Sequence, residues 1–280
     1  MKQSVDEKYL ELMELSYKLA DRYKQIMTYV REARCLFTAQ ICRTCFNDSA
    51  NANAAARSCN RHLKRLYEEG LLGRIERQVG GYVKGSSAYI WYLTEKGADL
   101  LDLDDKYKDS KKGKKTRILV PATGTMQHNL AVAECWVQLM ELAQKHPKLQ
   151  IKEVTFEPNN WKYHGENNKE VLKPDLYTTL FHDSNLYSWF VEVDLGTESI
   201  QEILRKCVRY HKYLRSGIEQ KQNGVFPATV WITTTPKRKQ EMEDAIRHNF
   251  ENFPKIFIVI TADEFGKLML AKTVKEERFC

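Results

Sequence analysis

The sequence has no long hydrophobic run. Its longest uncharged apolar stretches, such as residues 256–260, are far shorter than the roughly 20 residues that a membrane helix needs. Asp6 and Glu7 stand where a signal peptide would need an apolar stretch. These absences predict a soluble, unexported chain without a membrane partner.

A regular cysteine pattern is also missing. The seven cysteines are an odd number without even spacing, and a chain of 280 residues can fold without disulfides, so we expect a reducing cytoplasm. Cys42 and Cys45 form a C-x-x-C pair near Cys35 and Cys59, which offers either a zinc site or core packing. Core packing is favoured because Cys42 and Cys45 fall inside a predicted helix, and because Cys59 lies on the apolar stripe of the next predicted helix.

Two common catalytic motifs are absent. The glycine-rich stretch GGYVKGSS has no lysine-serine ending and leads into a predicted strand, so nucleotide hydrolysis lacks support. The chain has no G-x-S-x-G segment for a nucleophilic serine. Its 42% hydrophobic residues nevertheless suffice for one large or two ordinary hydrophobic cores, which excludes global disorder.

Positive charge is concentrated at the N-terminal end. The net charge of +7 divides into +4 for residues 1–101, +3 for residues 102–117 and zero for residues 118–280. Such an imbalance favours a polyanionic partner for the first part. The segment 102–117, DLDDKYKDSKKGKKTR, is almost wholly charged or small and cannot fold alone. It predicts a linker between an N-terminal domain, 1–101, and a C-terminal domain, 118–280.

The first 30 residues carry one apolar stripe. Positions spaced alternately by four and three predict a single long helix. These positions are Val5, Tyr9, Leu12, Ser16, Leu19, Tyr23, Ile26 and Val30. Either the rest of the domain covers this stripe, which is the favoured alternative, or a second copy of the chain does so in a homodimer.

The rest of the N-terminal domain predicts three helices followed by a two-stranded hairpin. After the first helix, helices are expected at 38–46 and 54–69, strands at 72–79 and 88–93, and a closing helix capped by Thr94. This is the order of a winged helix-turn-helix domain. The segments LKRLYEEGLLGRI and YLTEKGADLL resemble the third helix, wing strand and closing helix of bacterial winged-helix proteins.

The third predicted helix has the composition of a DNA-reading helix. Ala56, Cys59, Leu63 and Leu66 form an inward stripe, and no acidic residue occurs between Ala50 and Tyr67. Cations and amides on the outer face are what phosphate and base contacts in a major groove need. The expected contacts to double-stranded DNA are Asn53, Arg57, Asn60, Arg61, Lys64 and Arg65, with Lys84 at the wing tip.

The C-terminal domain predicts a mixed α/β sandwich, which makes the whole chain an α+β protein. Helices are expected at 128–145, 199–214 and 237–250, and strands at 151–156, 176–181, 188–194, 228–233 and 255–261.

Carboxylates interrupt two of these apolar strands. Asp175 opens one strand after Pro174, and Glu192 and Asp194 lie two apart on one face of the next. Buried carboxylates need compensation, and hard oxygen ligands on neighbouring strands suit Mg²⁺ or Mn²⁺. The alternative for Asp194 is to cap the helix that follows, and for Asp175 to cap a turn.

This part of the chain resembles the PD-(D/E)XK nuclease superfamily, which has a restriction-endonuclease-like core. Pro174 and Asp175 match the PD half and Glu192 matches the acidic residue of the second half, but position 194, where the superfamily places its lysine, is Asp. The resemblance implies a Mg²⁺-dependent nuclease.

Three further residues follow from this resemblance. Lys206 and Tyr210, four apart on the next helix, look like the glutamine and tyrosine pair of some exonuclease members, and Lys206 offers the displaced lysine. Glu134 resembles an extra acidic ligand; its alternative is a solvent-facing glutamate. The expected catalytic residues are therefore Asp175, Glu192, Asp194, Lys206 and Tyr210, with Asp175, Glu192 and Glu134 as metal ligands.

A narrower resemblance extends over nearly the whole chain. The HNLAVAE helix, the KPD strand and VEVDLGTESIQEILRKCVRYHKY are similar to the replication-relaxation proteins of plasmids and integrative elements. The resemblance implies DNA binding and replicative or topological processing of a mobile element. Two hypotheses remain, a metal-dependent DNA nuclease or nickase, and a non-enzymatic winged-helix regulator or accessory protein with a degenerate nuclease fold.

Overall fold

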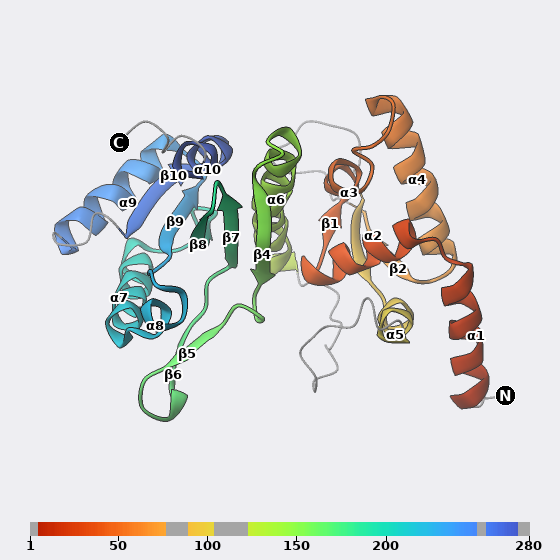
Figure 1. Ribbon diagram of the computed structural model, residues 1–280, viewed down its shortest axis with the longest axis horizontal. Coiled ribbons are helices and arrows are strands. Elements are labelled where there is room, and N and C mark those ends of the chain that lie inside the picture. Colours follow the sequence, from red (N-terminus) through yellow and green to blue (C-terminus); the bar gives the residue numbers. More distant parts are fainter. Residues whose placement is uncertain (1–4, 77–88, 104–122, 251–255, 274–280) are drawn as a thin grey trace. The chain divides into compact units, whose positions relative to one another are not determined.

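The computed structural model describes residues 5–76, 89–103, 123–250 and 256–273 (Figure 1). Contacts within the chain divide it into two compact units, Met1–Ala133 and Glu134–Cys280. The division falls inside one long helix, α6 (Thr123–Lys145). Lys84 and most of the predicted linker, 104–117, lie outside the described residues.

The first unit contains five helices in its described residues besides the first part of α6. They are α1 (Val5–Lys18), α2 (Asp21–Glu32), α3 (Thr38–Cys45), α4 (Ala52–Glu68) and α5 (Glu95–Leu103). The prediction of one long N-terminal helix is wrong, because the backbone at Ala20 is extended and α2 begins anew at Asp21. Leu12 and Leu19 are nevertheless buried. The apolar spacing that predicted one continuous helix therefore persists across the break between α1 and α2.

Contacts within the chain cover part of that stripe. Helix α1 contacts α5, and Leu12 on α1 is buried. Tyr9, Leu10 and Tyr17 on the same helix are exposed. Intramolecular packing therefore accounts for the buried positions, and a homodimer through this helix stays a prediction.

A small antiparallel sheet completes the first unit. Its strands β1 (Leu36–Phe37), β2 (Leu72–Ile75) and β3 (Ile90–Leu93) lie in the order β1-β3-β2. The two-residue strand β1 is too short for the sequence pattern to reveal. Gly70 takes a positive φ of 71° at the turn after α4, and the Thr94 hydroxyl accepts a hydrogen bond from the Gly97 amide, which confirms the predicted cap of α5.

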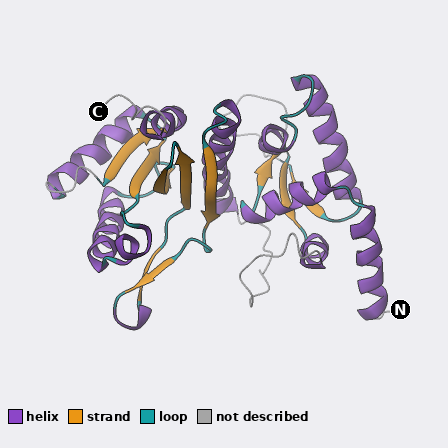
Figure 2. Cartoon of the chain, viewed as in Figure 1, coloured by secondary structure: helices purple, strands orange, loops and turns teal. Residues whose placement is uncertain are grey.

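The second unit is built on a five-stranded mixed sheet (Figure 2). Strand order is β10-β9-β8-β7-β4; β4, β7 and β8 pair antiparallel, whereas β8, β9 and β10 pair parallel. The strands are β4 (Gln150–Phe156), β7 (Leu176–His182), β8 (Asn185–Asp194), β9 (Ala228–Thr233) and β10 (Phe257–Thr261). All five predicted strands are present, within three residues of their predicted bounds.

Helices cover both faces of this sheet. On one face, α7 (Ile200–Ser216) and α9 (Pro236–Asn249) bury a cluster around Phe190, Trp231 and Met242. On the other, Trp136 of α6 packs edge to face on Phe156, and α10 (Phe265–Thr273) contacts β7. The central strands β7, β8 and β9 are therefore largely buried, so a buried polar side chain within them needs a partner.

In the second unit, four elements besides two three-residue 3-10 helices were not predicted. The hairpin β5 (Lys162–His164) and β6 (Glu170–Leu172) is short and polar, and helices α8 (Ile218–Asn223) and α10 add to the C-terminal half. The whole is a mixed α and β protein, as predicted. Within the described ranges, no helix combines the length and apolar character needed to cross a membrane.

Candidate functional site

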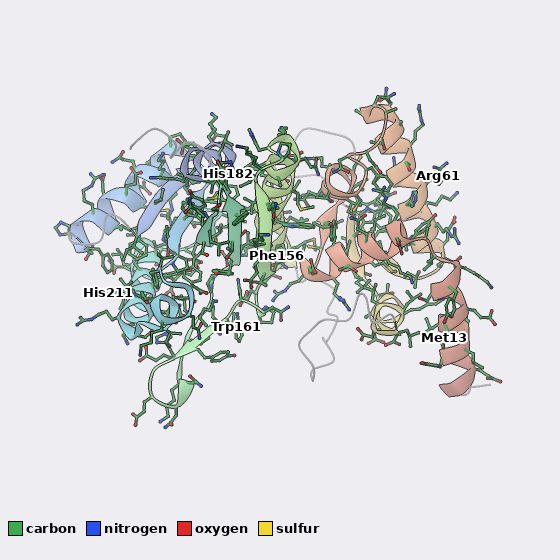
Figure 3. The ribbon with its side chains drawn as sticks, viewed as in Figure 1. Met13, Arg61, Phe156, Trp161, His182 and His211 are labelled. Atoms are coloured by element: carbon green, nitrogen blue, oxygen red, sulfur yellow. The ribbon has the colours of Figure 1, made fainter. Side chains whose placement is uncertain are left out.

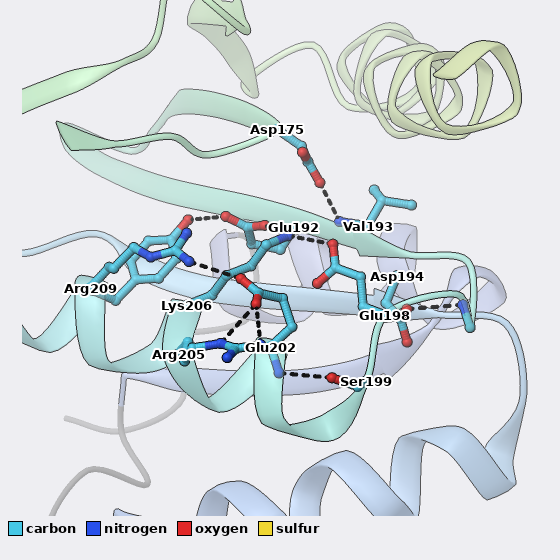
Figure 4. Close-up of polar contacts among 12 residues, drawn as sticks. Asp175, Glu192, Val193, Asp194, Glu198, Ser199, Glu202, Arg205, Lys206 and Arg209 are labelled. Carbon is cyan, nitrogen blue, oxygen red and sulfur yellow. Dashed lines mark hydrogen bonds and ion pairs between the residues drawn. The ribbon is translucent and has the colours of Figure 1, made fainter. Parts of the chain in front are cut away.

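Asp175 is held where β7 begins, beside the neighbouring strand. The buried side chain of Asn160 donates a hydrogen bond to the Pro174 carbonyl, with an N···O distance of 2.7 Å, and so fixes the backbone next to Asp175. One carboxylate oxygen of Asp175 accepts from the Val193 amide of β8 at 2.7 Å (Figure 4). Asp175 is thereby placed beside the strand segment that carries Glu192.

Glu192 is buried in β8 and is held by two side chains of α7. Its Oε1 accepts from the Tyr210 hydroxyl at 2.6 Å and its Oε2 from the Lys206 ammonium at 3.1 Å. Lys206 and Tyr210 are one helical turn apart, so both reach the same carboxylate. Burial, followed by the charge of Asp175, raises the pKa of Glu192 to about 7 although Lys206 opposes the shift.

The Lys206 ammonium is shared between two carboxylates. Besides Glu192 it contacts Glu198 Oε1 at 2.7 Å, and its side chain is only 20% exposed. Burial alone would lower the pKa of Lys206, but the neighbouring carboxylates outweigh it and the net direction is upward. Burial, then Glu192, raises the pKa of the Tyr210 phenol as well. Lys206 and Tyr210 therefore present a charged ammonium and a neutral hydroxyl to Glu192.

Asp194 pairs with Arg238 of α9 rather than with Lys206. Its Oδ1 accepts from the Gly196 amide at 2.9 Å, and its Oδ2 accepts from Arg238 Nε of α9 at 2.7 Å. The Asp194 side chain is fully buried and Arg238 is 14% exposed, so the two charges compensate each other. Arg238 also donates to the Glu198 carbonyl. Asp194 does not cap the following helix, as the alternative had it, because the cap of α7 is Ser199. It instead combines a local backbone hydrogen bond with an ion pair that the sequence did not reveal.

Glu198 is a site residue that the sequence analysis missed. It lies in the loop between β8 and α7, at the end of the segment VEVDLGTE. Its Oε1 contacts Lys206, whereas its Oε2 is buried and has no hydrogen-bond partner among the described residues. A buried carboxylate oxygen without a donor is costly, which makes this position a candidate for an additional ligand.

Carboxylate oxygens, as on Asp175 and Glu192, are the ligand type that hard divalent cations such as Mg²⁺ prefer. Asp175 and Glu192 supply two carboxylates on this side of the Lys206 ammonium, and burial followed by the charge of Asp175 raises the pKa of Glu192. No three His, Cys, Asp or Glu side chains in the described ranges are close enough to hold a metal together. Mg²⁺ is commonly held by one or two carboxylates and retains several waters, which matches so small a set.

Glu134 lies in the same part of the second unit. It is half-buried on α6, and its charge acts on the neighbouring thiol of Cys135. Burial raises the pKa of Cys135, and the charges of Glu134 and then Asp175 raise it further. Its predicted role as a metal ligand stays a prediction.

The first unit presents the second group of predicted residues on α4. All six polar residues predicted there are exposed, and Arg61 lies on the outer side of the helix (Figure 3). Asn51 caps the start of this helix, because its side chain accepts a hydrogen bond from the Ala54 amide. The inward stripe contains Ala55 rather than the predicted Ala56, together with Cys59, Leu63 and Leu66, which are buried as predicted.

Two cations of α4 have partners within the chain. Lys64 contacts Glu68 one turn along at 3.7 Å, and both side chains are exposed. The Arg65 guanidinium lies over the Tyr23 ring at 5.0 Å. Arg57 and Arg61 make neither kind of contact among the described residues. The outer face therefore keeps cations available for an anionic partner.

Comparison with known proteins gives a family assignment. The model of the replication-relaxation family matches residues 27–229, which is most of the chain and includes α4, Asp175, Glu192 and Lys206. No curated protein and no solved structure matches the chain significantly. The resemblance seen in the sequence is thereby confirmed at the level of the family. The chain belongs to the replication-relaxation family.

Proposed function

We propose that the chain is a metal-dependent DNA nickase that acts in the replication and relaxation of plasmid DNA. The observation that carries the proposal is the convergence of Asp175, Glu192 and Lys206 from two adjacent strands and the helix that follows them. The family assignment gives the biological context. The first unit is proposed to bind duplex DNA and the second to cleave one strand.

The topology of the second unit supports a PD-(D/E)XK-type core. Its core elements follow the order α6, β4, β7, β8, α7, β9, with the hairpin β5–β6 inserted between β4 and β7 and α8 between α7 and β9. The first three strands pair antiparallel and the fourth joins β8 in parallel. This is the arrangement that the resemblance to the nuclease superfamily implies, and it brings the start of β7 next to β8 where Asp175 and Glu192 lie.

The residues have distinct proposed roles. Asp175 and Glu192 would hold Mg²⁺ or Mn²⁺. A divalent ion bound there would supply charge neutralisation at the phosphate and activation of water. Lys206 keeps its proton beside Glu192 and stabilises negative charge that develops on the scissile phosphate. Tyr210 fixes one oxygen of Glu192.

The first unit supports a winged helix-turn-helix assignment. Helices α2, α3 and α4 are followed by the antiparallel strands β2 and β3, and β1 joins the same sheet. In such domains the third helix enters the major groove. Here that helix is α4, with Arg57 and Arg61 on its exposed face.

A non-enzymatic accessory or regulatory protein is the second candidate function. The observation that favours it is Asp194, which stands where the nuclease superfamily places its lysine and is neutralised by Arg238. In this alternative, Lys206 serves only to neutralise Glu192 and Glu198. Such a protein would bind DNA without binding a divalent ion or cleaving a strand.

Calorimetric titration of the full chain with Mn²⁺, without and with duplex DNA, distinguishes the two candidates. The nickase is expected to give a saturable heat at millimolar Mn²⁺ that Asp175→Asn abolishes. Asp244→Asn removes an exposed carboxylate from α9 and serves as the matched control, with the heat unchanged. Absence of a saturable heat in the wild type under both conditions would favour the regulator.

A further inference from the structure

Arg74 on β2 is held between two aromatic rings. Its guanidinium carbon lies 4.4 Å from the centre of the Tyr67 ring and 4.3 Å from the centre of the Tyr89 ring. Tyr67 belongs to the last turn of α4, and Tyr89 immediately precedes β3. Trp91, the cross-strand neighbour of Arg74, supports both tyrosines through edge contacts. Helix α4 and the segment at β3 therefore fix the position of one exposed arginine.

This arginine has no counterion among the described residues. Its guanidinium makes neither an ion pair nor a hydrogen bond in that part of the chain, whereas Arg22 and Arg31 of the same unit pair with Asp48 and Asp102. Stacking occupies the two faces of a guanidinium and leaves the N–H groups at its edge free to donate. Arg74 is thus a charged donor group with restricted rotation that lacks an acceptor within the described residues.

The surface around Arg74 continues the cationic face of α4. Arg57, Arg61, Lys64 and Tyr67 follow one another at spacings of three and four, which places them along one side of the helix. Tyr67 is 43% exposed and joins this side to Arg74 on the sheet. One row of positive charge therefore runs from α4 onto β2.

We infer that Arg74 binds a backbone phosphate of duplex DNA and extends the DNA-contacting surface from α4 to the sheet. The inference rests on the proposed DNA binding by the first unit. A guanidinium fork matches two phosphate oxygens. Because the two tyrosines already restrict the side chain, binding loses less rotational freedom than it would with a solvated arginine.

Fluorescence anisotropy of the full chain with a labelled duplex, measured over a series of salt concentrations, tests this inference. Arg74→Gln is expected to weaken binding about tenfold and to reduce the salt dependence by about one released counterion. Arg74→Lys keeps the charge and loses the planar stack. Its affinity for the duplex is expected to lie between those of the wild type and Arg74→Gln. Lys18→Gln removes one charge from an exposed site on α1 and is the matched control, with affinity changed less than about twofold.

The outcomes separate this inference from the proposed function. If the wild type binds duplex DNA and Arg74→Gln binds equally well with the same salt dependence, the role of Arg74 is refuted while DNA binding stands. If the wild type binds no duplex even at low salt, both are refuted. Tyr67→Leu removes one ring and keeps the arginine, so an equal affinity in this variant would refute the requirement for stacking. If Arg74→Gln fails to fold, Arg74→Lys is the deciding variant. A duplex affinity of Arg74→Lys equal to that of the wild type would then refute the inference that the guanidinium of Arg74 binds the phosphate.

Discussion

Removal of Arg238 is expected to destabilise the second unit strongly. The Asp194 side chain is fully buried, and Arg238 Nε lies 2.7 Å from its carboxylate. Deleting one partner of a buried ion pair leaves an uncompensated charge and costs about 3–5 kcal/mol. Arg238→Met keeps most of the aliphatic side chain, so lost packing contributes little. For a domain of this size the loss corresponds to a fall in melting temperature of about 6–20 °C.

A double-variant cycle measured by urea denaturation isolates the ion pair. Asp194→Asn combined with Arg238→Met is expected to recover at least about 1 kcal/mol relative to Arg238→Met alone, because no buried carboxylate is left without a partner. Arg205→Met on the surface of α7 breaks an exposed pair with Glu202 and is expected to change stability by less than about 1 kcal/mol. The reasoning is refuted if Arg238→Met is as stable as the wild type, or if the double variant shows no recovery.

Three further predictions concern the Glu192 site, the ion pair of Glu264 and the cations of α4. Tyr210→Phe removes one donor from buried Glu192 and should lower the free energy of unfolding by about 1–3 kcal/mol in urea denaturation; an unchanged midpoint would show that this bond does not contribute. Lys239 and the Thr261 amide lower the pKa of Glu264 from 4.5 to about 2, so its stabilising contribution is present above pH 4.5 and is lost as the pH falls towards 2. Since Glu264 is 39% exposed, the free energies of unfolding of the wild type and Glu264→Gln should differ by less than about 1 kcal/mol above pH 4.5. This difference should vanish as the pH falls from 4.5 to 2. A difference that does not change with pH would contradict the prediction. Replacing Arg57, Arg61 and Lys64 together by Gln should reduce the salt dependence of duplex binding by about three counterions, and an unchanged slope in anisotropy titrations would place the DNA surface elsewhere.

Much of the fold follows from local patterns in the sequence. Asn51 and Ser199 cap α4 and α7 through their side chains, and Gly70 ends α4 with a positive φ, all as their residue types suggest. The break at Ala20 was missed because apolar spacing continues in phase across it. The hairpin β5–β6 was missed because three-residue strands carry too little alternation to be recognised.

The candidate site was predictable only in part. Asp175 and Glu192 come together because adjacent strands pair, and Lys206 and Tyr210 because positions one turn apart share a helix face. Arg238 is 44 residues from Asp194 in the chain, and its approach depends on how α9 packs on the sheet. Glu198 depends likewise on the path of the loop before α7. Local spacing contains no information about either contact.

Cleavage of supercoiled plasmid DNA tests the central claim most directly. Wild-type protein is incubated with the plasmid and Mg²⁺, Mn²⁺ or a chelator, in parallel with Asp175→Asn and with the surface variant Asp244→Asn. The account predicts that the wild type and Asp244→Asn convert the plasmid to the nicked, open-circular form only with a divalent ion, and that Asp175→Asn does not. Equal nicking by Asp175→Asn, nicking in chelator, or no nicking by a wild type that binds the plasmid would contradict it.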